Sequence, residues 1–177
     1  MWKSSDKPLK AFGRKIRLVH HSDAEALANI YNHYVEHTIV SFEQVPITSI
    51  EMLKRIQKVL EFGRWIVVES EGKLIGYAYS ELWNNRCSYE KTHVVSIYLN
   101  HTSTVQGIGK MLYQDLINDP KKNCYHTLIG GVSLPNAGSV GLHEHFGFKQ
   151  VDHYQQVVFK FDKWINLGYW QLFLDSN

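Results

Sequence analysis

Ser103-Thr-Val-Gln-Gly107-Ile-Gly109-Lys110 joins an apolar, strand-like run at residues 94–99 to an amphipathic, helix-like run at residues 111–117. Glycines at such a junction let consecutive backbone N–H groups turn toward one point, and the helix N-terminus adds a partial positive charge. A pyrophosphate fits such a loop. The segment is not a P-loop, because no Gly-Lys-Ser/Thr follows, and it lacks the third glycine of a dinucleotide fingerprint. Taken alone, Gly-x-Gly is more typical of a tight turn than of a ligand site.

Strand-like and helix-like segments alternate on both sides of this loop, which predicts a mixed α/β domain. Two capping-box spacings, Ser22 with Glu25 and Thr48 with Glu51, predict where the first two helices begin. Residues 71–73 form a glycine-containing turn between two β-rich runs, which indicates a hairpin. Helices are expected at 26–34, 52–60, 111–117 and 136–145, and strands at 16–19, 65–70, 74–80, 94–99, 127–132 and from 148 to the end.

The composition fits one globular domain, because 177 residues lie within the usual range of a single domain. We expect a polar leader at residues 1–14 and one domain at residues 15–177. A net charge of +2 gives no electrostatic footprint for nucleic acid, and no apolar run approaches the length of a membrane span. Cys87 and Cys124 are too few for a disulfide framework, so a cytoplasmic protein is expected. His33 and His37 have metal-ligand spacing but no evident third ligand, so no metal is predicted.

Several ordered motifs accompany the glycine loop and make the sequence similar to a known family. They are Ile30–Tyr34 with Phe42, Trp83–Tyr89, Ile97–Leu99, Leu134–Asn136 with Ser139, His143 and Glu144, and Trp164 with Gly168–Gln171. The sequence resembles the GNAT N-acetyltransferase superfamily, and within it the phosphinothricin acetyltransferases. The resemblance implies a twisted, mostly antiparallel sheet of six to seven strands, about four flanking helices and a splayed parallel strand pair. It also implies acetyl-CoA as co-substrate and a homodimer.

The same resemblance assigns residues to acetyl-CoA. Ile97, Tyr98 and Leu99 would offer backbone groups to the pantetheine arm, and Asn136 would bind further along it. The pyrophosphate would be held by Val105, Gln106, Gly107, Ile108, Gly109 and Lys110. One departure from the family pattern is Thr104, where the family has Arg or Gln.

Acetyl transfer from a thioester to an amine needs a base for the amine and an acid for the leaving thiolate. His143 occupies the position of the acid by resemblance, and histidine can donate a proton near neutral pH. The branch's usual base is a strand glutamate, but that position is Val94 here. Glu90, acting through a water, and His93, which would need a strand bulge, are the alternatives.

The acceptor side is assigned by resemblance to Phe42, Arg86 and Tyr89, with Arg86 suited to a carboxylate or phosphinate. The predicted activity is acetylation of the amino group of a small amino acid or a toxic analogue such as phosphinothricin or methionine sulfoximine. Val94 leaves two rivals open. One is an acetyltransferase for another amine, such as a polyamine, an antibiotic or a protein N-terminus, and the other is a non-catalytic acetyl-CoA-binding protein.

Overall fold

The structure is a computed structural model that describes residues 13–103, 106–118 and 125–174. Nearly all of the expected leader, together with Thr104, Val105 and Cys124, lies outside the described residues.

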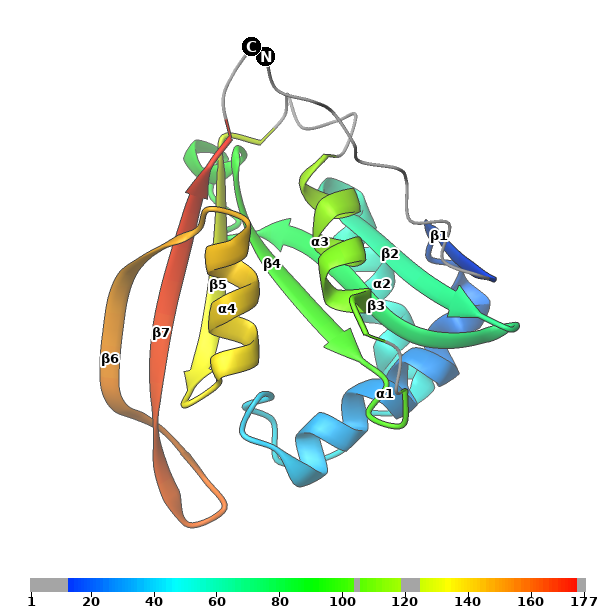
Figure 1. Cartoon of the computed structure of the whole chain (residues 1–177), viewed down its shortest axis with the longest axis horizontal. Coiled ribbons are helices and arrows are strands. Elements are labelled where there is room, and N and C mark those ends of the chain that lie inside the picture. Colours follow the sequence, from blue (N-terminus) through cyan, green and yellow to red (C-terminus); the bar gives the residue numbers. More distant parts are fainter. Residues whose placement is uncertain (1–12, 104–105, 119–124, 175–177) are drawn as a thin grey trace, which may run out of the picture.

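One seven-stranded sheet runs through the described chain (Figure 1). Its spatial order is β1-β2-β3-β4-β5-β7-β6, and every neighbouring pair is antiparallel except β4 and β5, which are parallel. The predicted mostly antiparallel sheet with one parallel pair is therefore confirmed. The strands are β1 (Arg14–Leu18), β2 (Arg64–Ser70), β3 (Lys73–Leu82), β4 (Thr92–Leu99), β5 (Thr127–Leu134), β6 (Lys149–Lys160) and β7 (Lys163–Phe173).

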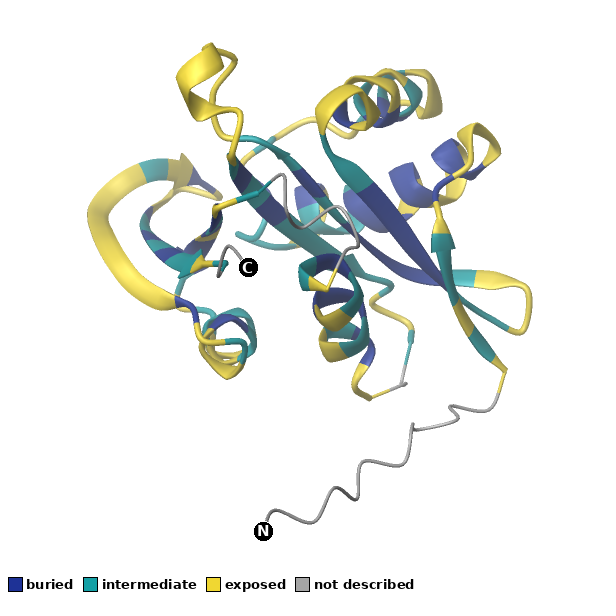
Figure 2. Cartoon of the chain, turned by 90° about the horizontal axis from the view of Figure 1, so that it is seen from above, coloured by how far each residue is buried: buried dark blue, intermediate teal, exposed yellow. Residues whose placement is uncertain are grey.

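Helices cover both faces of the sheet. In the described residues, α1 (Ala24–His37) and α2 (Ser49–Phe62) lie on one face, and α3 (Ile108–Ile117) and α4 (Ala137–His145) lie on the other (Figure 1). Each face has its own apolar core: Leu27, Ile56 and Trp65 belong to the first, and Leu112 and Val132 to the second. Two short 3₁₀ turns, His21–Asp23 and Cys87–Tyr89, precede α1 and β4. By contrast, β6 is exposed along almost its whole length (Figure 2).

Local sequence signals set several of these boundaries as expected. The Thr48 hydroxyl accepts a hydrogen bond from the Glu51 N–H at 3.2 Å and caps α2. Glu71 and Gly72 both have left-handed backbone, with φ of 52° and 74°, as a two-residue hairpin turn between β2 and β3 requires. Gly147, with φ of 84°, follows the last turn of α4 as predicted.

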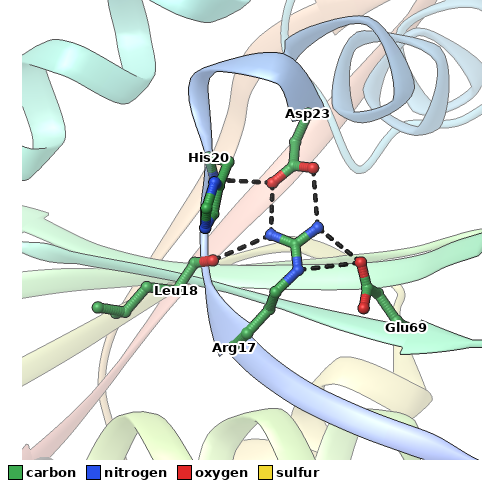
Figure 3. A network of polar contacts seen from close by, with 5 residues as sticks. All are labelled: Arg17, Leu18, His20, Asp23 and Glu69. Atoms are coloured by element: carbon green, nitrogen blue, oxygen red, sulfur yellow. Dashed lines mark hydrogen bonds and ion pairs between the residues drawn. The ribbon is translucent and has the colours of Figure 1, made fainter. Parts of the chain in front are cut away.

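The first predicted capping box is wrong. Helix α1 begins after Asp23 rather than Ser22, and no side chain caps its first turn. The Asp23 carboxylate instead accepts the His20 N–H at 2.7 Å and binds Arg17 through two guanidinium nitrogens at 2.7 and 2.9 Å (Figure 3). Arg17 also contacts Glu69 of β2 at 2.6 Å, so this network ties the start of α1 to two strands. Burial acts to raise the pKa of Asp23, but Arg17 and the His20 N–H outweigh it, and the pKa is lowered.

The parallel pair is short, which opens the sheet. Only Thr92–Val94 of β4 pair with Thr127–Ile129 of β5. Beyond these residues the two strands diverge, and the starts of α3 and α4 and the loop between α1 and α2 lie around the opening (Figure 1). The splay predicted for a parallel strand pair is confirmed.

Candidate active site

Three hollows follow one another across the opening between β4 and β5. The outer groove, of about 690 Å³, lies between the starts of α3 and α4 and is lined by Gly107, Lys110 and Asn136. The throat, of about 60 Å³, lies between the diverging strands and is lined by Tyr113 and His143. The inner hollow, of about 770 Å³, lies on the side of the α1–α2 loop. Val40 lines all three, so the hollows adjoin one another across the opening.

The outer groove brings together most of the residues predicted to bind the cofactor. They are Ile97, Leu99, Gly107, Gly109, Lys110 and Asn136. Tyr98 instead lines the throat and the inner hollow, Gln106 is exposed, and the Ile108 side chain is 1% exposed in the core. The Asn136 side chain accepts the Ser139 N–H at 3.1 Å, which caps α4 at the mouth of the groove.

The two glycines of the loop have different physical roles. Gly107 precedes α3 with a left-handed φ of 81°, a conformation that favours glycine. Gly109 has no positive φ, and a Cβ there would lie 3.4 Å from a methyl group of Leu142, in ordinary contact. The start of α3 points its partial positive charge at the groove, and Lys110, in the first turn of α3, also lines the groove. This end of the groove is therefore suited to an anion.

The backbone of β4 offers fewer free groups than predicted. Leu99 donates its N–H to the Tyr34 hydroxyl at 3.1 Å, and its carbonyl oxygen accepts from the same hydroxyl at 2.6 Å. The next residue, Asn100, donates to a β3 carbonyl at 2.9 Å. Because these directions alternate along a strand, Tyr98 bonds to β3, and the N–H and C=O of Ile97 face the opening. Ile97 is thus the residue of the three that presents both backbone groups to a bound arm.

His143 lies deep in the throat, with 3% of its surface exposed. Its Nδ1 is 2.8 Å from the carbonyl oxygen of Ser139, and its Nε2 is 2.9 Å from the Tyr113 hydroxyl. A neutral ring satisfies both contacts, because Nδ1–H donates to the carbonyl and Nε2 accepts from the hydroxyl. Burial lowers the pKa of His143, which favours this neutral form. Both nitrogens are engaged, so the predicted acid role stays a prediction.

The two predicted bases lie apart from the inner hollow. Strand β4 pairs with β3 in a regular register from Leu99 to His93, without the bulge that a catalytic His93 would need. His93 therefore faces away from Val94 and is buried, and burial lowers its pKa. With Glu90 and Arg86 it lines a side hollow of about 490 Å³, which adjoins the inner hollow and shares Lys58 and Glu81 with it. The structure does not bring Glu90 or His93 into the inner hollow.

A carboxylate that the sequence motifs did not indicate does line the inner hollow. Glu81, on β3, is the direct cross-strand partner of Val94 on β4. Burial raises the pKa of Glu81, and Lys58 and Arg55 of α2 oppose that shift. Only the pairing register of two strands reveals this position, so no local motif could have identified it.

The wall of the inner hollow is the loop between α1 and α2. Phe42 lines the hollow and is 44% exposed. The ammonium of Lys160, at the end of β6, donates to the carbonyl oxygens of Ser41 at 2.7 Å and Thr38 at 2.8 Å. This buried cation therefore holds the loop from a strand more than a hundred residues away, and no local motif indicates the contact.

The predicted acceptor residues are only partly together. Phe42 lines the inner hollow, whereas Arg86 lines the side hollow and Tyr89 is exposed and lines neither. The basic residue that lines the inner hollow itself is Lys58 of α2, which also lines the side hollow. Lys58 is a cation that the sequence motifs missed.

Two further observations concern metals and membranes. In the part of the chain that the structure describes, no cluster of three or more His, Cys, Asp or Glu side chains is arranged to hold a metal ion. His33 stacks on His101, with ring centroids 3.6 Å apart, and the His37 ring lies 5.1 Å from that of His33. Within the same residues, no helix combines the length and apolar character needed to cross a membrane.

Comparison with known proteins places the fold among acetyltransferases. A family model described as acetyltransferase (GNAT) domain matches residues 16–167. A phosphinothricin N-acetyltransferase of Alcaligenes faecalis is 37% identical over 153 residues, which cover 85% of this chain and 78% of that protein. A methionine sulfoximine and methionine sulfone acetyltransferase of Salmonella typhimurium is 29% identical, with 92% of this chain and 95% of that protein covered.

A solved structure agrees with these sequence similarities. The structure of a putative acetyltransferase of Salmonella typhimurium with its cofactor acetyl-CoA superposes with a TM-score of 0.88 at 28% identity. The superposition covers 93% of this chain and 96% of that chain.

Proposed function

This chain belongs to the GNAT acetyltransferase family, whose co-substrate is acetyl-CoA, and on that basis we propose its reaction and acceptor. The chain transfers the acetyl group to the amino group of a small amino acid or of a toxic analogue of the phosphinothricin or methionine sulfoximine type. The names of the relatives from Alcaligenes faecalis and Salmonella typhimurium support this acceptor class.

The observation that carries the proposal is the row of three adjoining hollows across the opening between β4 and β5. In the outer groove, the start of α3 and Lys110 would hold the pyrophosphate, and Ile97 would bond the pantetheine arm. The throat is too small for more than a few atoms, which suits a thioester. An amine entering from the inner hollow would reach that thioester from the opposite side.

Residue roles in the throat follow from its polar groups. As the amine nitrogen attacks the thioester carbon, the new C–N bond forms, the C–S bond breaks, and the departing thiolate takes a proton. We keep the predicted acid at His143 but place the proton on the Tyr113 hydroxyl that its Nε2 binds, because the neutral ring carries its own proton on Nδ1, toward Ser139. Tyr113→Phe should then lower the maximal rate without changing acetyl-CoA affinity.

For the acceptor's anionic group, we propose Lys58 in the inner hollow, assisted by Arg86 at its border, while Phe42 walls the side chain. Lys58→Ala and Arg86→Ala should each reduce kcat/KM for acceptors that carry a carboxylate, by about 10-fold or more for one charge-assisted bond. Neither should change the Kd for acetyl-CoA. An equal loss with an acceptor that lacks an anion would remove that residue from the anion site.

The experiment that tests the function is thiol release from acetyl-CoA across a panel of amines, with calorimetry of acetyl-CoA binding alongside. The panel contains phosphinothricin, methionine sulfoximine, ordinary amino acids, a polyamine, an aminoglycoside and an N-terminal peptide. Turnover of the first two supports the proposal. Turnover of only the last three would favour another amine as acceptor, and tight binding with no turnover would favour a non-catalytic acetyl-CoA-binding protein.

We also propose a cytoplasmic homodimer. The hairpin of β6 and β7 exposes large apolar side chains that a second copy would cover, namely Val151, Tyr154, Val157, Phe159, Phe161 and Trp164. The exposed free thiol of Cys87 suits a reducing compartment. Light scattering after size exclusion tests the dimer, and Trp164→Glu should shift it toward the monomer.

A further inference from the structure

We propose that Glu81 is the general base that takes the proton from the acceptor's amine, in place of the absent carboxylate at position 94. The inference rests on the proposed function, since it assigns a catalytic residue to that reaction.

The pairing of β3 with β4 puts Glu81 where the missing carboxylate would stand. Glu81 is directly opposite Val94 in a register without bulges. The Trp83 N–H donates to the Thr92 carbonyl at 3.0 Å, so alternation makes the pair at 81 and 94 a hydrogen-bonded one, with Cα atoms about 5.5 Å apart. Direct cross-strand partners project from the same face of a sheet. Exchanging the two side chains would therefore move a carboxylate by one strand without changing the face.

That face is the one that the acceptor reaches. The inner hollow is lined by Glu81 together with Val94, Ser96 and Tyr98, which alternate along the same side of β4. Ser96 and Tyr98 continue into the throat. A carboxylate at residue 81 thus opens onto the space from which an amine would approach the thioester.

The surroundings of Glu81 make it a stronger base than an exposed glutamate. The side chain is half-buried, and desolvation raises its pKa above the ordinary 4.5 while leaving it open to the hollow. Lys58 and Arg55 of α2 act in the opposite direction, which favours the ionised form that a base needs. Besides the inner hollow, Glu81 lines the side hollow and a third hollow of about 330 Å³ beside Met52 and Trp65. The other titratable or charged side chains around these three hollows are Tyr31, Glu43, Glu61, Tyr77, Tyr79, Arg86, Cys87, Glu90, His93, Tyr98, Tyr125 and Tyr169.

The neighbouring carboxylates are worse placed. Glu43 lines the inner hollow but is paired with Arg55 at 2.8 Å. Glu90 lies in the side hollow, and Glu61 lies there too, on the exposed surface of α2. Glu81 is therefore the carboxylate of the inner hollow that has no ion pair within 4 Å among the described residues.

In the proposed step, a Glu81 carboxylate oxygen takes one proton from the acceptor's ammonium group, directly or through one water. The freed lone pair of the amine attacks the thioester carbon, the C–N bond forms and the C–S bond breaks. The electron pair of the C–S bond leaves on sulfur. As the amide forms, the nitrogen loses its second proton and sulfur gains one through the Tyr113 hydroxyl, so the products are the N-acetyl amine, free coenzyme A and a protonated Glu81.

The test compares Glu81→Gln with the wild-type chain on an amine that the wild-type chain acetylates. Glu81→Gln should lower kcat by about 100-fold or more. It should leave the Kd for acetyl-CoA unchanged and move the rising limb of the pH–rate curve toward the pKa of the acceptor's amine. Glu61→Gln is the matched control, since it makes the same substitution outside the inner hollow and should leave both the rate and the pH curve unchanged.

Relocating the carboxylate completes the test. Val94→Glu in the Glu81→Gln background should recover at least 10-fold of the lost kcat and return the rising limb toward acid pH. If the wild-type chain is active and the Glu81→Gln variant keeps its rate and pH curve, Glu81 is not the general base, while the proposed function stands. A wild-type chain that binds acetyl-CoA but acetylates no amine would instead refute the proposed function, and the base with it.

Discussion

Replacing Gly130 with alanine should force His143 out of the throat. An added Cβ would lie 2.0 Å from His143 Nε2 and 2.4 Å from Cδ2, far inside van der Waals contact. The ring has little room to retreat, because it packs edge-on against Phe148 with centroids 5.1 Å apart and its Nδ1 is held at 2.8 Å by Ser139. The ring must therefore shift and break its bond to the Tyr113 hydroxyl at 2.9 Å.

Two costs set the magnitude of this effect. Overpacking a filled core costs about 1 to 3 kcal/mol. Leaving the buried Tyr113 hydroxyl without its partner costs about 1 to 3 kcal/mol more. Gly130→Ala should thus reduce the free energy of unfolding by about 2 to 6 kcal/mol. At roughly 2 to 4 °C per kcal/mol for a chain of this size, the Tm should fall by at least about 4 °C.

Urea unfolding at neutral pH measures this loss, and the adjacent glycine supplies the control. A Cβ at Gly131 would project to the other face of β5 and meet only side-chain atoms, the nearest being Tyr169 Cε1 at 3.3 Å. Gly131→Ala should therefore cost much less than Gly130→Ala. The two variants differ by one position on the same strand, so strand propensity cancels between them.

A double mutant identifies His143 as the cause. In the His143→Ala background the clash is gone and the Tyr113 hydroxyl has already lost its partner, so Gly130→Ala should cost about 2 to 6 kcal/mol less than it does in the wild-type chain. Equal stability of Gly130→Ala and Gly131→Ala would refute the close packing of His143 on β5. Additive costs in the double mutant would show that the loss arises elsewhere.

Three further predictions address the groove, the loop and the ion network. Gly107→Val should weaken acetyl-CoA binding in calorimetry, because a β-branched residue is strained at a φ of 81°. Gly109→Ala should fold normally, so any change in its affinity would report only on how closely the ligand approaches the loop. Equal affinity for the wild type and both variants would remove the loop from the site. Lys160→Met should raise the KM for the acceptor and leave the Kd for acetyl-CoA unchanged, since it frees the loop that carries Phe42; the prediction fails if both constants stay at wild-type values. Arg17→Met should lower the free energy of unfolding by about 1.5 to 3 kcal/mol at pH 7. Because the pKa of Asp23 is lowered below its usual 3.8, this contribution is present above that pH and is lost as the pH falls through the folded-state value, so unfolding curves of variant and wild type should converge in acid.

Several signals that depend on a few consecutive residues predicted the local structure correctly. The Thr48 cap, the Glu71–Gly72 hairpin turn and the stop at Gly147 each follow from backbone geometry that one or two residues dictate. The same holds for the glycine loop, because the left-handed backbone at Gly107 is a local property. The order of strands and helices, and the family with it, could thus be predicted from the sequence.

The sequence pattern did not predict the start of α1, because a distant side chain competes there with the local helix cap. Ser22 and Glu25 have the spacing of a capping box, but Arg17 and the His20 N–H engage Asp23, and the helix begins one residue later. The guanidinium belongs to Arg17 of β1, so the spacing of residues 22–25 alone contains no information about its contact with Asp23.

Contacts between residues that are distant along the chain could be seen only in the tertiary structure. Glu81 faces the proposed acceptor because β3 pairs with β4 in one particular register, and a shift of one residue would turn it to the other face. Lys160 reaches the loop at Ser41 only because β6 ends beside it. Local backbone preference is encoded residue by residue, so the sequence determined the elements and the loop. Which side chains share a hollow depends on strand register and packing, which only the assembled fold determines.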